Sequence, residues 1–386
     1  MRTTTSIRVG APLAVVALAA AACGGSSSGG GGGGGGSSSY TIACQGPLTG
    51  DYAALGINIC DGAKLAIDQA NQKGDLGFTL KYKGVDDQGS PDGARPASQS
   101  IVQDSSIIAV VGPAFSGATQ ASEQTFAQAN LLSMTASATL PTLTDPSNNF
   151  TTFYRAVATD SSQGEAAANY LADKLNAKKV YSVDDAEAYG QGLAKTLESA
   201  LKSKNIQVIH DSVPQGTKQW EPEAAKVKQS GADAVYFSGY YPEAGPFAKA
   251  LRNAGYDGVF MSDDGTKDPK FVELAGSASN GAYLTCPCAD ASKNQDFASA
   301  YKDAFKQDAG TYSAEAYDVA NAIISILKGL GSDGITRQAV AQAAANVNYQ
   351  GITKTISFGD NHELQTTQAY LYKVDNGDIK YIGPIS

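Results

Sequence analysis

Hydroxyl side chains follow two strand candidates in the first third of the chain, where they could bind a carboxylate. Ser116 begins a predicted helix directly after the strand candidate 107–111, so its hydroxyl and the next backbone N–H groups point out of a helix N-terminus. Ser137 and Thr139, on either side of Ala138, follow the next strand candidate and add two hydroxyls and further N–H donors. The alternative is that Ser116 is only an N-cap and that the other two are loop hydroxyls.

An acidic pair follows a later strand candidate, which ends at Met261. Asp263 and Asp264, with Gly265 behind them, are typical of a turn. A free amino acid is a zwitterion, so a site that excludes water must offer donors to its carboxylate and an acceptor to its ammonium. The loops after these strands contain both kinds of group.

The elements that must position these loops form an alternating pattern. Residues 40–386 are 347 in number, which at about 150 residues per domain suggests two domains. Strand candidates lie at 40–44, 78–85, 107–111, 131–135, 153–157, 179–183, 207–213, 234–238, 258–261, 282–286, 353–358 and 369–374. Helical periodicity between them marks 63–72, 163–175, 192–202, 223–229, 243–253, 296–306 and 316–327. Such alternation predicts an α/β fold with parallel, doubly wound sheets.

Two sheets are expected rather than one. A single sheet of about twelve strands would be unusual without splitting. Two sheets joined by crossovers would leave a cleft between them, faced by the carboxyl ends of both sets of strands. We therefore expect function to lie in the loops that follow the strands.

The first residues predict export. Arg2 and Arg8 precede the apolar run 11–22, which is too short to cross a bilayer as a stable helix and ends beside Cys23. We interpret 1–22 as a signal peptide. The segment Leu18-Ala19-Ala20-Ala21-Ala22-Cys23-Gly24 resembles a bacterial lipoprotein cleavage box, which implies a lipid on Cys23 and anchoring to the outer face of the cell membrane. The alternative is an ordinary cleaved signal, with Cys23 incidental.

A tether is expected next. Residues 24–39 are only Gly and Ser, a composition that gives a flexible chain, so 23–39 would be a lipidated Cys followed by a linker. Lipid on Cys23 and such a linker fit a globular domain held near a membrane.

Four further cysteines lie in a chain that is expected to reach an oxidising compartment. We favour the pairs Cys44–Cys60 and Cys286–Cys288, although four cysteines allow three connectivities. A zinc site is the weaker interpretation, because neither pair has CxxC spacing and no His lies close in sequence to either. We therefore expect no metal.

The composition argues against other kinds of partner and site. The 386 residues include 29 Lys and Arg against 38 Asp and Glu, a net charge of −9 without a basic cluster, so no nucleic-acid partner is expected. Two His leave little material for a His-based metal site or triad. The GxGxxG run at 329–334 follows a helix instead of a strand, and outside the Gly/Ser segment 24–39 the sequence has no GxSxG, P-loop or HExxH motif. The sequence therefore supports neither an enzyme nor a cofactor.

A series of short motifs then gives a family resemblance over 40–386. They are Gly46-Pro47-Leu48-Thr49-Gly50 with Gly56 and Gly62-Ala63, Asp86-Asp87, 112–116, Ala136-Ser137-Ala138-Thr139 with Pro141, Tyr189-Gly190, Gly239-Tyr240-Tyr241-Pro242-Glu243 and Asp263-Asp264-Gly265. In this order they resemble the leucine/isoleucine/valine-binding proteins of ABC importers. The resemblance implies the type I periplasmic-binding-protein fold: two doubly wound parallel-sheet lobes, a three-strand hinge and a ligand cleft that closes. The lobes would be 40–158 plus 287–363 and 159–286 plus 364–386.

The resemblance also implies roles for individual residues. The ligand's α-carboxylate would lie on Ser116, Ser137, Ala138 and Thr139, and its ammonium on Asp264, where the family more often has Glu. Aromatic walls of the cleft would be Tyr189, Tyr240 and Tyr317, while Leu55 and Phe115 would touch the ligand's side chain. No Arg or Lys falls among these positions, so an uncharged side chain is favoured.

The expected function is that of an exported importer subunit, a monomer that binds a branched-chain or other uncharged amino acid and passes it to ABC permease subunits. Two alternatives share the fold. One is a ligand-sensing domain that signals to a receptor, and the other is a binder of amides, short peptides or aromatic acids.

Overall fold

The structure is a computed structural model that describes residues 38–386. The predicted signal peptide 1–22, the lipidation at Cys23 and nearly all of the predicted tether 23–39 lie outside the described residues. Ser39 already belongs to the first strand. No helix within 38–386 has the length and apolar character needed to cross a membrane.

The first third of the described chain builds a five-stranded sheet with the order β2-β1-β3-β4-β5. All neighbouring strands in it run parallel, as predicted. Its strands are β1 (Ser39–Gly46), β2 (Thr79–Asp86), β3 (Ile107–Val111), β4 (Leu132–Thr135) and β5 (Phe153–Arg155).

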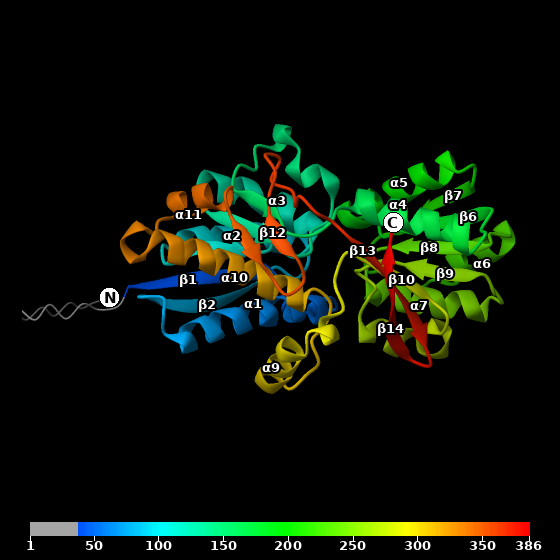
Figure 1. Ribbon diagram of the computed structural model, residues 1–386. Coiled ribbons are helices and arrows are strands. Elements are labelled where there is room, and N and C mark those ends of the chain that lie inside the picture. Colours follow the sequence, from blue (N-terminus) through cyan, green and yellow to red (C-terminus); the bar gives the residue numbers. More distant parts are fainter. Residues whose placement is uncertain (1–37) are drawn as a thin grey trace, which may run out of the picture. The chain divides into compact units, whose positions relative to one another are not determined.

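Helices cover both faces of this sheet, and β1 shows why. Ile42 and Cys44 point to one apolar cluster, while Ala43 between them points to another, so the strand is buried on both sides. These helices are α1 (Ala53–Lys73), α2 (Pro91–Gln103), α3 (Ser116–Gln128), α10 (Ser313–Leu330) and α11 (Arg337–Ala344), and a further helix, α9 (Gln295–Phe305), packs on α1. Helices α1 and α10 pack side by side (Figure 1), and so do α2 and α3. A small antiparallel pair, β11 (Asn348–Gln350) and β12 (Thr355–Ser357), contacts α10. We call this assembly the N-terminal lobe.

The second sheet has seven strands in the order β14-β13-β10-β9-β8-β6-β7. These strands are β6 (Lys179–Asp184), β7 (Gln207–Ser212), β8 (Ala234–Ser238), β9 (Val259–Ser262), β10 (Tyr283–Cys286), β13 (Ala369–Asp375) and β14 (Asp378–Ile385). The helices of this second assembly, the C-terminal lobe, are α4 (Asp160–Asn169), α5 (Ala188–Ser203), α6 (Glu221–Ser230), α7 (Tyr241–Asn253) and α8 (Pro269–Ala275). A π-helical turn, η3 (Tyr170–Lys174), extends α4.

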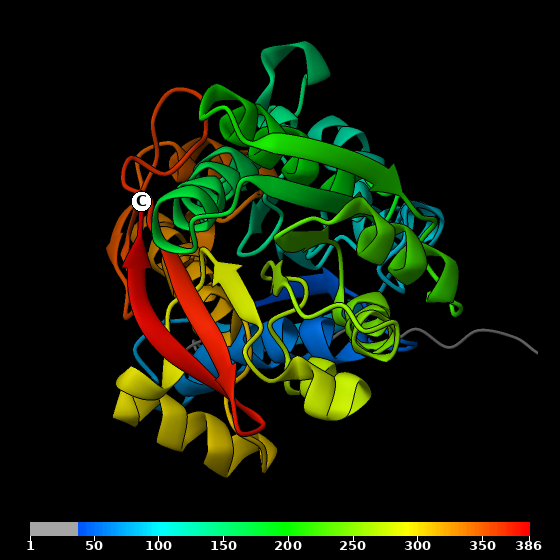
Figure 2. The same ribbon diagram turned by 90° about the vertical axis from the view of Figure 1, so that its right-hand side faces the viewer.

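One edge of the second sheet differs from the wholly parallel prediction. Strand β13 runs antiparallel to β10, and β14 runs antiparallel to β13. Figure 2 shows this hairpin, in red, beside β10, in yellow. Asn376 and Gly377 between the two strands both have positive φ, 52° and 86°, which suits a tight two-residue turn that reverses the chain. The sheet is therefore mixed.

Three passages of chain join the lobes. They lie between β5 and α4 (156–159), after β10 (287–290) and between β12 and β13 (358–368). Short 3-10 turns occur in the connections: η1 (Pro141–Thr144), η2 (Pro146–Asn148), η4 (Gly276–Ser279), η5 (Ala291–Lys293) and η6 (Ser332–Gly334).

The cysteines within 38–386 form two disulfides. Cys44 on β1 is bonded to Cys60 on α1, with Cα atoms 5.6 Å apart, so the bond ties the helix to the sheet. Cys286 at the end of β10 is bonded to Cys288, with a Cα separation of 5.0 Å. Both members of the second pair are fully buried where the chain leaves the C-terminal lobe.

Candidate functional site

A pocket lies between the two lobes at the carboxyl ends of their strands. Side chains from both lobes line it: Leu55, Ile59, Ala114, Phe115, Ser116, Ser137, Tyr189, Tyr240, Asp264, Gly265 and Tyr312. The empty space among them is about 290 Å³, including the part that opens to solvent. Its position is that expected for a ligand site in open α/β sheets.

The start of α3 forms the electropositive end of the pocket. Ser116 is the first residue of this helix and is 1% exposed, and Phe115 before it gives no side-chain cap. The first N–H groups of a helix have no partner within the helix, and the helix dipole favours an anion there. The backbone N–H of Leu140 donates to Ser116 Oγ over 3.3 Å, which leaves the hydroxyl hydrogen of Ser116 free to donate to a ligand. This end of the pocket can therefore bind a carboxylate.

The loop after β4 contributes less directly than expected. Ser137 lines the pocket, but its hydroxyl donates to the carbonyl oxygen of Ala114 at 2.7 Å. The backbone N–H groups of Ser137 and Ala138 donate to Thr135 Oγ1, at 3.3 and 3.0 Å. Ala138 and Thr139 are buried and do not line the pocket. Of the two serines that line the pocket, Ser116 is the one whose hydroxyl donates to no protein acceptor in the described chain; the hydroxyl of Thr139 also has no partner there, but Thr139 does not line the pocket.

The acidic end of the pocket is Asp264, which two tyrosines hold. Tyr189 donates its hydroxyl to Asp264 Oδ1 and Tyr312 donates to Oδ2, both at 2.8 Å. Burial raises the pKa of the Asp264 carboxyl, and these hydrogen bonds oppose that rise. Tyr189 and Asp264 belong to the C-terminal lobe, whereas Tyr312 immediately precedes α10 of the N-terminal lobe. The acid therefore bridges the lobes and offers acceptor capacity to a cation.

The neighbouring Asp263 has the structural role that the turn pattern predicts. It accepts hydrogen bonds from the backbone N–H groups of Gly239 (2.8 Å) and Thr266 (3.2 Å) and is fully buried. Burial, and then the nearby Asp264, raise the pKa of Asp263 well above its usual range. Gly265 follows because a Cβ there would overlap the carbonyl oxygen of Gly239. The turn thus aims one acid into the loop and the other into the pocket.

Aromatic rings from both lobes form a wall of the pocket. Phe115 of the N-terminal lobe stacks on Tyr240 of the C-terminal lobe, with ring centroids 4.3 Å apart. Tyr189 lies 5.3 Å from Tyr240 on this wall, and Tyr52, which does not itself line the pocket, lies edge-on to Tyr240 at 5.4 Å. Leu55 and Ile59 of α1 add aliphatic surface. No Lys or Arg lines the pocket.

One expected residue lies elsewhere. Tyr317 is on α10, its hydroxyl donates to Gln69 Oε1 at 2.7 Å and its ring packs on Phe297 at 5.1 Å, so it does not line the pocket. Tyr312, five residues earlier, takes the place by the acid. Its φ of 64° is rare for a tyrosine, and no sequence signal marked it.

The sequence also left out Ile59, Ala114 and Gly265. Ile59 lies one helical turn after Leu55 on the same face of α1, so a helix predicted to begin before Leu55 would have indicated it. Within residues 38–386, no group of three or more His, Cys, Asp or Glu is arranged to hold a metal ion.

Comparisons with known proteins agree with this architecture. A family model described as periplasmic binding protein matches residues 39–378. The chain is 32% identical over 346 residues to the Leu/Ile/Val-binding protein BraC3 of Rhizobium johnstonii, covering 88% of this chain and 92% of that protein. It is 29% identical over 337 residues to a leucine-, isoleucine-, valine-, threonine- and alanine-binding protein of Pseudomonas aeruginosa, covering 86% and 89%.

Among solved structures, the chain resembles the branched-chain amino acid transporter substrate binding protein LivJ of Streptococcus pneumoniae in complex with isoleucine. The TM-score is 0.81 and the identity 27%, over 90% of this chain and 100% of that one.

Proposed function

This chain belongs to the periplasmic-binding-protein family, and on that premise we propose that it is the substrate-binding protein of an ABC importer. It holds a branched-chain or other uncharged amino acid between its lobes and delivers it to a membrane permease. The observation that supports this proposal is that one small pocket has hydrogen-bond donors at one end and an acidic acceptor at the other. Free donors at Ser116 and the start of α3 face the carboxylate, and Asp264 faces the ammonium.

The lining favours a ligand with an uncharged side chain. Leu55, Ile59 and Phe115 supply apolar surface, and burying an aliphatic side chain against it contributes roughly 1.5–3 kcal/mol. An acidic side chain would find no Lys or Arg in this lining. The names of the relatives, which specify leucine, isoleucine and valine, agree with this class of ligand.

Binding and closure are linked in this proposal. The lobes, 40–158 plus 287–363 and 159–286 plus 364–386, move about the three passages of chain between them. The carboxylate first docks on the N-terminal lobe at Ser116, with Ser137, Ala138 and Thr139 forming the loop behind it. Closure then brings Tyr189, Tyr240 and Asp264 over the ligand. The protein is a monomer that binds its ligand without converting it, and after export it is anchored through a lipid on Cys23.

Isothermal titration of residues 38–386 against the twenty amino acids tests the proposal. We expect leucine, isoleucine or valine to bind, and aspartate and glutamate not to bind. Mass spectrometry of the recovered ligand should show it unchanged. If the amino acids fail while an amide, a short peptide or an aromatic acid such as benzoate binds, the fold assignment stands and the proposed ligand is wrong.

A further inference from the structure

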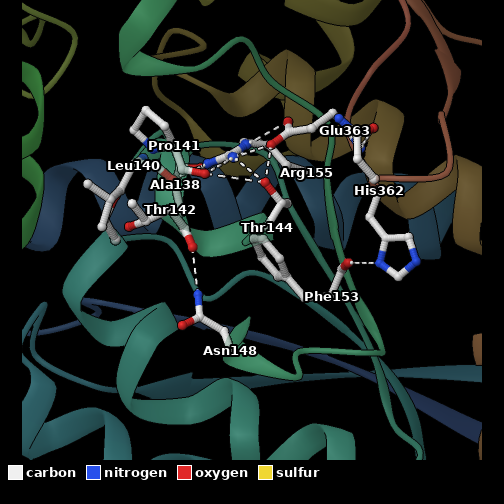
Figure 3. Close-up of polar contacts among 12 residues, drawn as sticks. Ala138, Leu140, Pro141, Thr142, Thr144, Asn148, Phe153, Arg155, His362 and Glu363 are labelled. Carbon is white, nitrogen blue, oxygen red and sulfur yellow. Dashed lines mark hydrogen bonds and ion pairs between the residues drawn. The ribbon is translucent and has the colours of Figure 1, made fainter. Parts of the chain in front are cut away.

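A buried arginine lies behind the carboxylate-binding loop, at the edge of the N-terminal sheet. Arg155 is the last residue of β5 and is fully buried. Its guanidinium donates to the carbonyl oxygens of Leu140 (2.6 Å), Ala138 (3.3 Å) and Pro141 (3.3 Å). Figure 3 shows the guanidinium among these acceptors. A guanidinium has five donor hydrogens in a fixed plane, so it sets the directions of several carbonyls at once.

Arg155 forms an ion pair with Glu363, which is distant from it in the sequence. Arg155 Nε donates to Glu363 Oε2 at 2.9 Å, and Nη2 donates to the other carboxylate oxygen (Figure 3). Thr144 bonds to both side chains through its hydroxyl. Glu363 lies in the 358–368 passage between the lobes, and Arg155 directly precedes the 156–159 passage. The ion pair therefore joins two of the three connections at the point where they leave the N-terminal lobe.

The loop that Arg155 holds is hydrogen-bonded to a hydroxyl group of the pocket, that of Ser116. Leu140 gives its carbonyl to Arg155 and its N–H to Ser116 Oγ. Because one peptide unit of this residue faces the guanidinium and the preceding one faces Ser116, the orientation of the loop at Leu140 is set from both sides. The N–H of Leu140 occupies a lone pair of the Ser116 oxygen, which leaves the hydroxyl hydrogen for the pocket.

We propose that Arg155, paired with Glu363, is a positioning residue for ligand binding. It holds the 138–141 carbonyls so that the N–H of Leu140 bonds to Ser116, and this bond leaves the Ser116 hydroxyl hydrogen for the ligand carboxylate. Arg155 does not line the pocket and acts only through Leu140 and Ser116. The proposal rests on the proposed function for the identity of the ligand, but its contacts within the protein can be tested separately.

A double-mutant cycle tests the route through Ser116. Arg155→Lys keeps the charge but cannot reproduce the planar set of donors, so we expect affinity for leucine to fall about tenfold. In a Ser116→Ala background, the same change should cost less than twofold, because the route is already broken. In a Tyr189→Phe background, which alters the acidic end, the tenfold loss should persist. An equal loss in all three backgrounds would overturn the inference.

A matched control is Arg337→Lys. Arg337 also donates to backbone carbonyls in the N-terminal lobe, those of Ile107, Val102 and Asp104, at 2.7–3.0 Å, but it has no contact with the pocket lining. This variant should keep the affinity for leucine. If Arg155→Lys does not fold, Glu363→Gln replaces it in the cycle. We expect Glu363→Gln to lower the affinity for leucine a few fold, and to have no such effect in a Ser116→Ala background.

Hydrogen exchange at the amide of Leu140 provides a measurement that needs no ligand. Arg155→Lys should speed this exchange at least tenfold and leave strand β8 of the other lobe unchanged, and Arg337→Lys should not affect Leu140. Unchanged protection of Leu140 in Arg155→Lys would refute the inference. If the wild-type protein binds no amino acid, the proposed function fails and this exchange measurement alone decides the role of Arg155.

Discussion

Replacing Asp264 with asparagine removes the proposed partner of the ligand's ammonium while keeping the size of the side chain. Asp264 is 4% exposed and accepts hydrogen bonds from Tyr189 and Tyr312. Removing one partner of a buried ion pair costs about 3–5 kcal/mol. We take the lower end, about 3 kcal/mol, because burial already opposes ionisation of this acid. At about 1.4 kcal/mol per factor of ten, affinity for leucine should fall roughly a hundredfold.

The same change should not destabilise the ligand-free protein. Burial raises the pKa of Asp264 above its value in the unfolded chain, so the stability gained from the protonated form is complete below the unfolded pKa, about 3.9, and is lost as the pH rises through the folded pKa. Asparagine does not ionise. The variant should therefore melt at the same or a higher temperature than wild type at pH 7, and at nearly the same temperature at pH 4.

Isothermal titration with leucine and thermal melts of the ligand-free protein at the two pH values measure both effects. Asp318→Asn is a matched control, since Asp318 is buried in the N-terminal lobe and accepts hydrogen bonds from the backbone of Ile352 and Thr353 at 2.8 Å. Because Asp318 does not line the pocket, this change should keep the affinity for leucine. Wild-type affinity in Asp264→Asn would show that the ammonium binds elsewhere, and a large fall in its melting temperature would show that the acid is structural.

Two further predictions concern residues that do not line the pocket. Tyr52→Phe removes a 2.6 Å bond to Glu243 that joins the lobes, so affinity for leucine and for isoleucine should fall by the same factor, about two- to tenfold, in titrations. Tyr317→Phe is its control and should change neither affinity; unequal losses in Tyr52→Phe would contradict a closure effect. Burial raises the pKa of Glu123 to about 8, so the stability of its protonated form, complete below about pH 4.5, is lost as the pH rises through 8. Glu123→Gln should raise the melting temperature at pH 9 and leave it unchanged at pH 4, and a pH-independent difference would refute this reasoning.

The strands and their alternation with helices could be predicted because buried parallel strands give continuous apolar runs. The predicted segments 107–111 and 234–238 coincide with β3 and β8. The hairpin strand β14 was missed because its residues are exposed or only partly buried, so its pattern lacks an apolar run. The edge of a sheet is less visible in a sequence than its centre.

The first helix was predicted to begin ten residues too late, at residue 63 instead of Ala53, and packing explains why. Gly56 and Gly62 lie inside α1, where glycine normally argues against a helix. A Cβ at Gly56 would overlap the carbonyl oxygen of Pro47, and one at Gly62 would overlap that of Ser313. These glycines allow close contacts with segments that only the folded chain brings near.

In the pocket, residue types could be predicted but donor directions could not. The position of Ser116 at the start of a helix follows from local sequence. The direction of its hydroxyl depends on Leu140, and that of Ser137 depends on Ala114, which belong to other loops. Tyr317 was predicted to line the pocket, but Tyr312 does. Tyr312 was missed because no local sequence pattern predicts its unusual backbone conformation.

The stacked rings of Phe115 and Tyr240 have a kinetic consequence. They come from different lobes and touch each other on the pocket wall, and Asp264 and Tyr312 join the lobes at a second place on it. Exchange of a molecule held inside requires both contacts to separate. The rate at which the lobes open is therefore an upper limit to the dissociation rate of any ligand. Weakly bound ligands should all dissociate near this limit, and tightly bound ligands more slowly.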